Sequence, residues 1–483
     1  MALDSTLIET GATARLAEFT AALRYEDLPP AVVAGAKRLI LDTVASAIGG
    51  HTLEAGRIVE QVGAEMGAGH ATILGSGAHA PAAAAAFANA YLGNVLDADD
   101  TFMNAGHPAA CAVFPALALA ETERLSGKAL IAAVAAGFEV GARIGMSLVR
   151  SRTDETGKTT RSAQSGLGWY VFGAAAAAAS ALALDPGQAA SAFGVAGFAS
   201  PLGFALRWQQ PKTGRNMMKY SPNGFLAFEG VVAAQLARRG FTGDPAIFDG
   251  DYAYWEMAGA FASDLDRQVT DLGSQWWVTE TSLKPHAVGR FAQPAVWLLQ
   301  QLIAEHGLTA DEIEGVEVRT FETAAGPWFS GQRIPENPID MQFSIPLALA
   351  SVAHGLDLGP RSQTMARVTD PRINNFAAKV RVSVNPEAAV EIHRQMTADG
   401  RMRAIPNEVE VRARGRTFLA KGAYAKGDPW TEASRMTDAD LRGKLELYAE
   451  GVLAPEKVRG LAAALFELED AADVRAGLSG VLA

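Results

Sequence analysis

Length, composition and charge exclude several classes of protein. The chain has 483 residues, of which 49% are hydrophobic and 20% charged, so we expect a large buried core divided over two or more domains. The formal net charge of −11 argues against nucleic acid and anionic membrane as partners. The single cysteine, Cys111, excludes an intrachain disulfide and a cysteine-based metal site, which is typical of a reducing cytoplasm.

The first part of the chain, residues 1–269, has helical spacing of its apolar residues. They recur every three or four positions in ATARLAEFTAALRY and GKALIAAVAAGFEVGARIGMSLV, and alanine runs at 82–86 and 174–179 favour closely packed helices. The N-terminus lacks the features of a signal peptide, and the very apolar run VFGAAAAAASALALD is too short to span a bilayer. We expect a soluble, all-helical domain.

The pattern changes over residues 270–425. EIEGVEVRTFE and KVRVSVN alternate apolar and polar residues as half-buried strands do, and NEVEVRARGRTFLAKGAY predicts a strand, a turn near Gly415 and a second strand. Helical patterns lie between them, so we expect a smaller α+β domain. Residues 426–483 are helical again and are expected to rejoin the first domain. The predicted fold is therefore mainly α, with an inserted α+β domain.

One segment places a histidine just before a predicted helix. In NVLDADDTFMNAGHPAACAVFPALALAE, residues 94–121, Pro108 favours a helix start, so His107 is expected at a helix N-terminus, where partial positive charge suits a bound carboxylate. Histidine transfers protons near neutral pH, and Asp97 could fix its tautomer. Two other interpretations remain open: the aspartates and His107 only cap and pack the helix, or the aspartates bind a metal.

Basic side chains precede two further predicted helices. Arg215 and Lys219 lie in QQPKTGRNMMKYSPNGFLAF, and Lys284, His286 and Arg290 lie in SLKPHAVGRFAQPAV. Both segments are also compatible with solvated basic loops. If the fold brings them together with the histidine segment, they form a cationic pocket suited to a di- or tricarboxylate. The sequence contains no P-loop, dinucleotide-binding, zinc-protease or serine-hydrolase motif.

Five blocks of the chain resemble the MmgE/PrpD family in their order and spacing. They are LDADDTFMNAGHPAACAVFPALALAE, FGAAAAAASALALDPGQAASAFGVAG, GRNMMKYSPNGFLAFEGVVAAQLARRGFTG, KPHAVGRFAQPA and QFSIPLALA. The family includes 2-methylcitrate dehydratases, cis-aconitate decarboxylases and iminodisuccinate epimerases. The resemblance implies a large helical domain, a smaller lid domain, an active site between them, a homodimer, and no metal or organic cofactor.

The resemblance also implies which residues line the site, namely Asp97, Thr101, His107, Lys219 and Lys284. Three positions depart from the family pattern, and one of them is Gln293, which replaces the later histidine of the motif around Lys284. Gln164 falls where dehydratases and decarboxylases usually carry a catalytic histidine, and glutamine does not exchange a proton near neutral pH. His286 replaces a usual tyrosine. The departures put activity on methylcitrate or cis-aconitate in question.

The sequence favours a cofactor-independent, dehydratase-type lyase that abstracts a proton next to a carboxylate of a small di- or tricarboxylate. His107, oriented by Asp97, would transfer the proton, and Lys219 and Lys284 would hold substrate carboxylates. The residues expected to act in catalysis are His107, Asp97, Lys219, Lys284 and His286, and those expected to bind substrate are Thr101, Gln164, Arg215 and Arg290. An epimerase or racemase and a non-catalytic polycarboxylate binder are the alternatives. We expect a cytoplasmic homodimer without nucleic-acid or membrane partners.

Overall fold

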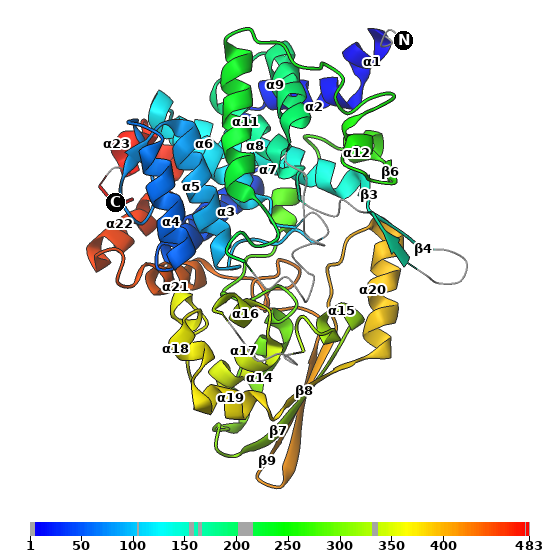
Figure 1. The fold of residues 1–483 in the computed structure, drawn as a ribbon, viewed down its shortest axis with the longest axis vertical. Helices are drawn as coiled ribbons and strands as arrows, with labels where there is room; N and C mark the ends of the chain where they lie inside the picture. Colours follow the sequence, from blue (N-terminus) through cyan, green and yellow to red (C-terminus); the bar gives the residue numbers. More distant parts are fainter. Residues whose placement is uncertain are drawn as a thin grey trace. The chain divides into compact units, whose positions relative to one another are not determined.

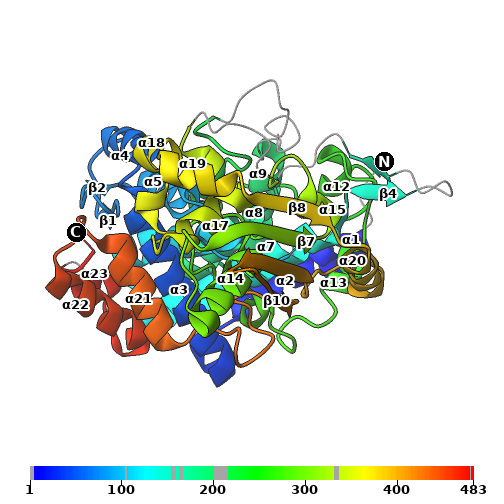
Figure 2. The same cartoon turned by 90° about the horizontal axis from the view of Figure 1, so that it is seen from below.

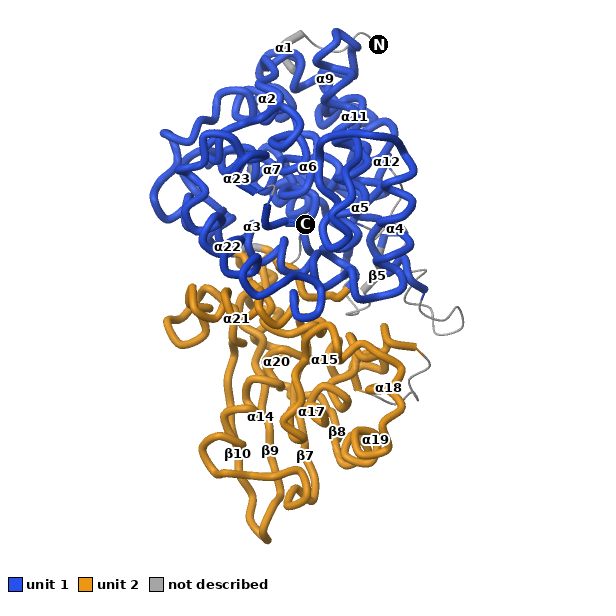
Figure 3. The backbone as a smooth tube through the Cα atoms, turned by 90° about the vertical axis from the view of Figure 1, so that its left-hand side faces the viewer, with its two compact units in different colours: residues 1–95, 105–280, 449–483 blue, residues 96–104, 281–448 orange. Residues whose placement is uncertain are grey.

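The structure is a computed structural model that describes residues 5–103, 106–153, 159–162, 167–200, 216–330, 337–478 and 480–482. Helices predominate in these ranges, which confirms a mainly α protein. The chain divides into two compact units (Figure 3): unit 1 comprises Met1–Val95, Ala105–Glu280 and Ala449–Ala483, and unit 2 comprises Leu96–Asn104 and Thr281–Tyr448. The sequence patterns predicted the two domain boundaries after residues 269 and 425. That the α+β part is an inserted lid stays a prediction.

Unit 1 is built from helices. They are α1 (Ser5–Thr10), α2 (Ala12–Ala22), η1 (Tyr25–Asp27), α3 (Pro30–Gly50), α4 (Glu54–Glu65), α5 (Ala82–Val95), α6 (Ala109–Glu123), α7 (Gly127–Ser147), α8 (Tyr170–Ala181), α9 (Pro186–Ala199), α11 (Asn223–Arg238), α12 (Tyr254–Met257), α13 (Leu265–Gln268), η2 (Trp277–Glu280), α22 (Pro455–Phe466), η4 (Leu468–Asp470) and α23 (Val474–Leu478). Its short strands pair two by two: β1 (Ala71–Thr72) with β2 (His79–Ala80), β3 (Leu148–Val149) with β6 (Ala262–Ser263), and β4 (Ser151–Thr153) with β5 (Thr159–Arg161).

Small residues let the central helices of unit 1 approach closely. Helix α8 packs against α6, α7 and α11 (Figure 1), and its alanine run is almost completely buried. Gly137 and Gly141 of α7 face Gly173 of α8, and a Cβ at Gly137 would come within 2.8 Å of the Gly173 carbonyl oxygen. The expected close packing of the alanine-rich helices is confirmed, because only small residues fit at this crossing.

Helix α7 is the one described helix that is long and apolar enough to cross a membrane. However, 89% of its apolar window is buried inside the protein, as in the core helix of a soluble protein. Helix α8, which contains the apolar run considered in the sequence, is shorter.

Unit 2 contains a four-stranded sheet in the order β10-β9-β7-β8. The strands are β7 (Ile313–Thr320), β8 (Val380–Val384), β9 (Asn407–Ala413) and β10 (Arg416–Gly422). All four were predicted from alternating apolar and polar residues, and the alternation of buried and less buried side chains is clear in β7 and β9. The pair β7–β8 is parallel and the others are antiparallel. The β9–β10 turn lies at Arg414 and Gly415, as predicted, and both residues have positive φ.

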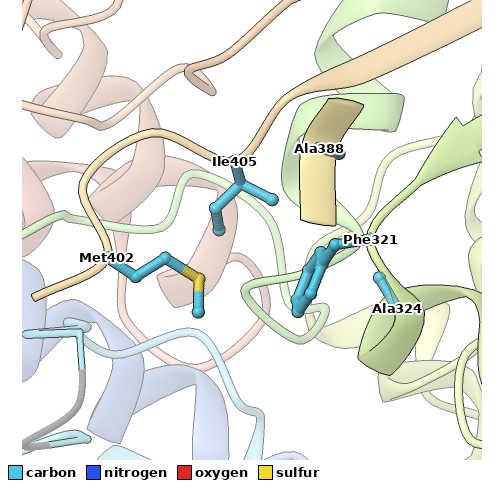
Figure 4. Packing of buried hydrophobic residues seen from close by; sticks show 5 residues of the cluster. All are labelled: Phe321, Ala324, Ala388, Met402 and Ile405. Atoms are coloured by element: carbon cyan, nitrogen blue, oxygen red, sulfur yellow. The ribbon is translucent and has the colours of Figure 1, made fainter. Parts of the chain in front are cut away.

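Unit 2 also contains helices, some of which pack on this sheet. They are α14 (Gln293–His306), α15 (Glu322–Ala325), α16 (Ile339–Gln342), α17 (Ile345–Ala353), η3 (Pro360–Ser362), α18 (Met365–Val368), α19 (Pro371–Ala377), α20 (Pro386–Asp399) and α21 (Asp438–Ala449). Helix α14 contacts β9 and β10, and α17 contacts β8 (Figure 2). A small apolar cluster ties α15 and α20 to the loop before β9 (Figure 4); it contains Phe321, Ala324, Ala388, Met402 and Ile405.

Candidate functional site

In unit 1, His107 lies immediately before helix α6. The helix begins at Ala109 with Pro108 as its N-cap, so the predicted place of His107 at a helix N-terminus is confirmed and the helix starts one residue later than expected. His107 is 8% exposed. Its Nε2 lies 2.8 Å from the Tyr220 hydroxyl oxygen, and its backbone N–H donates to the hydroxyl of Tyr170.

The residue before the histidine explains this approach of Tyr170. Gly106 has φ +78°, a left-handed conformation that favours glycine. A Cβ at Gly106 would collide with the Tyr170 hydroxyl oxygen, so only glycine leaves room for it. The hydroxyl of Tyr170 therefore fixes the backbone of His107, while that of Tyr220 meets its ring.

Lys219 belongs to the same part of unit 1. It is 2% exposed, and its Nζ donates to the carbonyl oxygen of Asn94 at 2.7 Å, near the C-terminal end of α5, where the helix carries partial negative charge. The Nζ also lies 5.2 Å from the ring centre of Tyr220, within the range of a cation–π contact. Lys219 has φ +58°, a strained backbone conformation for a residue with a side chain. Lysine, tyrosine and histidine thus form one cluster, here called the histidine cluster: His107, Tyr170, Lys219 and Tyr220.

In unit 2, the segment after α5 brings two aspartates to Lys284. The Lys284 Nζ lies 3.5 Å from an oxygen of Asp97 and 3.6 Å from an oxygen of Asp99, and all three side chains are at most 1% exposed. We call these three residues the lysine cluster. The two carboxylates more than compensate the buried ammonium charge, which would be very unfavourable without them. Asp97 has φ +57°, so a predicted site residue is again strained.

Backbone pairing holds the aspartate segment in unit 2. Thr101 and Ser282 exchange two backbone hydrogen bonds, of 2.8 and 3.0 Å, as an isolated antiparallel bridge. The hydroxyl of Thr281 donates to the Asp100 carboxylate at 3.1 Å. Thr101, which was predicted to bind substrate, therefore takes part through its backbone in joining this segment to the segment of Lys284.

Arg290 and His286 follow Lys284 in the chain. Arg290 Nη2 donates to both carboxylate oxygens of Asp428, at 2.6 and 2.7 Å, and Asp428 also accepts from the Ser282 hydroxyl at 2.6 Å. One nitrogen of the guanidinium is thus used in an internal ion pair. Enclosure by protein lowers the pKa of His286 to about 4, an effect that a hydrogen bond with Gln300 opposes and the charge of Lys444 reinforces. His286 is therefore neutral near pH 7.

Several predictions fall outside what these contacts test. Gln164 and Arg215 lie outside the described residues. The orientation of His107 by Asp97, the absence of a metal or cofactor, and the homodimer stay predictions. Sequence reasoning missed Tyr170 and Tyr220, although Tyr220 directly follows Lys219. No periodicity or motif distinguishes a tyrosine that packs from one whose hydroxyl meets a histidine.

Comparisons with known proteins cover most of the chain. Residues 14–262 match the model of the MmgE/PrpD N-terminal domain, and residues 286–468 match that of the MmgE/PrpD C-terminal domain. The cis-aconitate decarboxylase-like protein oryM of Aspergillus oryzae is 28% identical over 308 residues, which are 59% of this chain and 60% of that protein. A cis-aconitate decarboxylase of Aspergillus terreus is 27% identical over 410 residues, 78% of this chain and 79% of that protein. The first match therefore spans less than two thirds of the relative.

Proposed function

The chain belongs to the MmgE/PrpD family, and we propose that it is a lyase that moves a proton next to a carboxylate in a small di- or tricarboxylate. The names of the Aspergillus relatives favour decarboxylase chemistry and make cis-aconitate the first substrate to test, and dehydration is the other lyase reaction considered. In a dehydration, a base takes the α-proton, and the β-hydroxyl leaves as water after an acid, which can be the protonated base, has donated a proton to it. In a decarboxylation, CO₂ leaves and an acid protonates the remaining carbon. Both reactions need one positioned proton-transfer group and a cation near the developing charge.

The observation that carries the proposal is the 2.8 Å contact between His107 Nε2 and the Tyr220 hydroxyl. An imidazole changes its protonation state near neutral pH, and the adjacent phenol can donate to it or accept from it. We assign His107 as the proton-transfer group and Tyr220 as the group that sets its tautomer. Lys219, next in the chain to Tyr220, supplies positive charge for a substrate carboxylate.

In unit 2, Lys284 is proposed as a cation that can bind a substrate carboxylate. Its distances of 3.5 and 3.6 Å to the aspartates exceed those of charge-assisted hydrogen bonds, which are roughly 2.7–2.9 Å. Among the described residues, the Lys284 Nζ has no hydrogen-bond partner. Its N–H groups therefore remain able to donate to a substrate carboxylate, while Asp97 and Asp99 stabilise its positive charge. Because its pKa is lowered to about 4, His286 binds a proton only weakly near pH 7, so we retain it as a neutral hydrogen-bonding residue and not as the main proton-transfer group.

The reaction is tested by incubating the protein with cis-aconitate, citrate, methylcitrate and smaller dicarboxylates in D₂O and recording NMR spectra. Loss of CO₂ with a new methylene or alkene signal, or hydration and dehydration between alkene and alcohol, supports a lyase. Deuterium at the α-carbon with loss of stereochemistry and no alkene supports the epimerase instead. Binding without exchange of any proton leaves the polycarboxylate binder and overturns the proposal. The same reaction after dialysis against EDTA tests the proposed independence of metal ions.

A further inference from the structure

Gln363 joins two predicted site segments within unit 2. It follows η3, and its side chain is 1% exposed. Its Nε2 donates to the carbonyl oxygens of Leu96 and Ala287, at 2.7 and 2.9 Å. Its Oε1 accepts from the Nε2 of Gln342 at 2.7 Å. One buried primary amide thus uses both of its N–H groups and its oxygen.

These carbonyls belong to the backbone that carries the lysine cluster. Leu96 directly precedes Asp97, and the second carbonyl lies three residues after Lys284. On the other side of Asp97, the carbonyl oxygen of Ala98 accepts from the Nζ of Lys444 at 2.7 Å. Hydrogen bonds therefore fix the strained backbone of Asp97 on both sides. The side chain of Gln363, which binds on one side, also binds the segment of Lys284.

We propose that Gln363 is a positioning residue, which fixes the Asp97 carboxylate relative to the Lys284 ammonium and so sets how Lys284 meets a substrate carboxylate. The proposal rests on the proposed function, because that function gives Lys284 its role. The chemistry of the position demands an amide, since two acceptors face its nitrogen and one donor faces its oxygen. A carboxylate of the same shape would place negative charge against two carbonyl oxygens.

Kinetics of two Gln363 variants test this role. Gln363→Glu keeps the shape and removes both donors, and Gln363→Met removes the polar contacts without adding charge. We expect both to fold and to lose roughly 10–100-fold in kcat, with a higher KM, because a shift of about 1 Å in a reacting group has this effect. The matched control is Gln395→Glu. Gln395 also clamps unit 2 backbone, donating to the Ala404 carbonyl oxygen at 2.9 Å, but holds no predicted site residue. It is expected to keep the wild-type kcat.

A second readout does not depend on turnover. The rate at which acetic anhydride acetylates Lys284 is measured by peptide mass spectrometry, relative to Lys379, which donates to the Ile313 carbonyl oxygen at 2.8 Å elsewhere in unit 2. We expect this ratio to rise several-fold in both Gln363 variants and to stay unchanged in Gln395→Glu. If the wild type converts no carboxylate, the proposed function fails while the labelling ratio still decides the positioning role. An unchanged ratio in both Gln363 variants, or an equal rise in the control, overturns it.

Discussion

The histidine cluster of unit 1 and the lysine cluster of unit 2 are built in different ways. The histidine cluster lies at helix ends: His107 precedes α6, Lys219 precedes α11 and reaches the end of α5, and Tyr170 begins α8. Its hydrogen bonds join the Tyr220 hydroxyl to the His107 ring and the Tyr170 hydroxyl to the His107 backbone N–H. A third joins the Lys219 Nζ to a carbonyl oxygen near the end of α5. In the lysine cluster, by contrast, the side chains come from segments outside helices and strands, and an ammonium lies between two carboxylates.

This difference concerns what holds each residue in place. A helix end is fixed by the packing of the whole helix, so the histidine cluster depends on few further contacts. The loop of Asp97 follows the end of α5 and is further held by the backbone bonds of Thr101 to Ser282 and by the side chains of Gln363 and Lys444. We therefore expect substitutions in the histidine cluster to reduce mainly turnover. Substitutions in the lysine cluster are expected to reduce mainly the stability of the protein and the positioning of Lys284.

The largest effect is expected for His107→Ala. Loss of the proton-transfer group should lower kcat by roughly 10²–10⁴-fold, measured by substrate NMR, without a change in circular dichroism. The matched control is His51→Ala, since the His51 Nδ1 pairs with Glu60 at 2.9 Å in unit 1 outside the cluster. Near-normal turnover of the His107 variant would remove it from catalysis.

Next is Lys284→Met, which leaves two buried carboxylates without their cation. Removing one partner of a buried ion pair lowers the free energy of unfolding by roughly 3–5 kcal/mol, and binding of a carboxylate substrate should weaken as well. Lys379→Met serves as the control in unit 2. Urea unfolding and KM measure both effects. A stable variant with the wild-type KM would show that Lys284 has neither role.

A smaller effect on turnover is expected for Tyr220→Phe. The variant keeps the ring and removes the hydroxyl at His107 Nε2, which is worth about 1 kcal/mol, or roughly a five-fold change in rate. The pH–rate profile should shift too, because the His107 ring loses the hydroxyl group that we propose sets its tautomer. Tyr254→Phe, which loses a hydroxyl bonded to Ser200, is the control. An unchanged profile would place Tyr220 outside the proton transfer.

The smallest effect on turnover is expected for Glu139→Gln. Glu139 is a buried residue of α7 that does not belong to the histidine cluster. Burial raises its pKa from 4.5 to about 7, opposed by the charge of Arg143 and the N–H of Val278. The folded state therefore binds this proton more tightly than the unfolded state, so stability falls as pH rises from about 4.5 to about 7. Glu139→Gln should flatten this fall, measured by hydrogen exchange of α7 at pH 5 and pH 8. Equal pH dependence in both proteins would contradict the raised pKa.

Much of the fold was predictable from the sequence, because its signals are local. Period-two alternation identified all four strands of the unit 2 sheet, and proline and apolar spacing placed His107 at the start of α6. The bounds of the two units were not predictable. Residues 96–104 belong to unit 2 through the pairing of Thr101 with Ser282, far along the chain, and no local pattern records such a pairing.

The sequence by itself determined the family, the helical character and the cationic and histidine residues that the proposed function uses, since these follow from residue type and spacing. Only the tertiary structure decided their partners. It joined His107 to two tyrosines, Lys284 to two aspartates, and Arg290 to Asp428. It also lowered the pKa of His286. Hydrogen bonds, ion pairs and burial depend on which distant segments the folded chain brings within a few ångströms, and this depends on the packing of whole helices and loops.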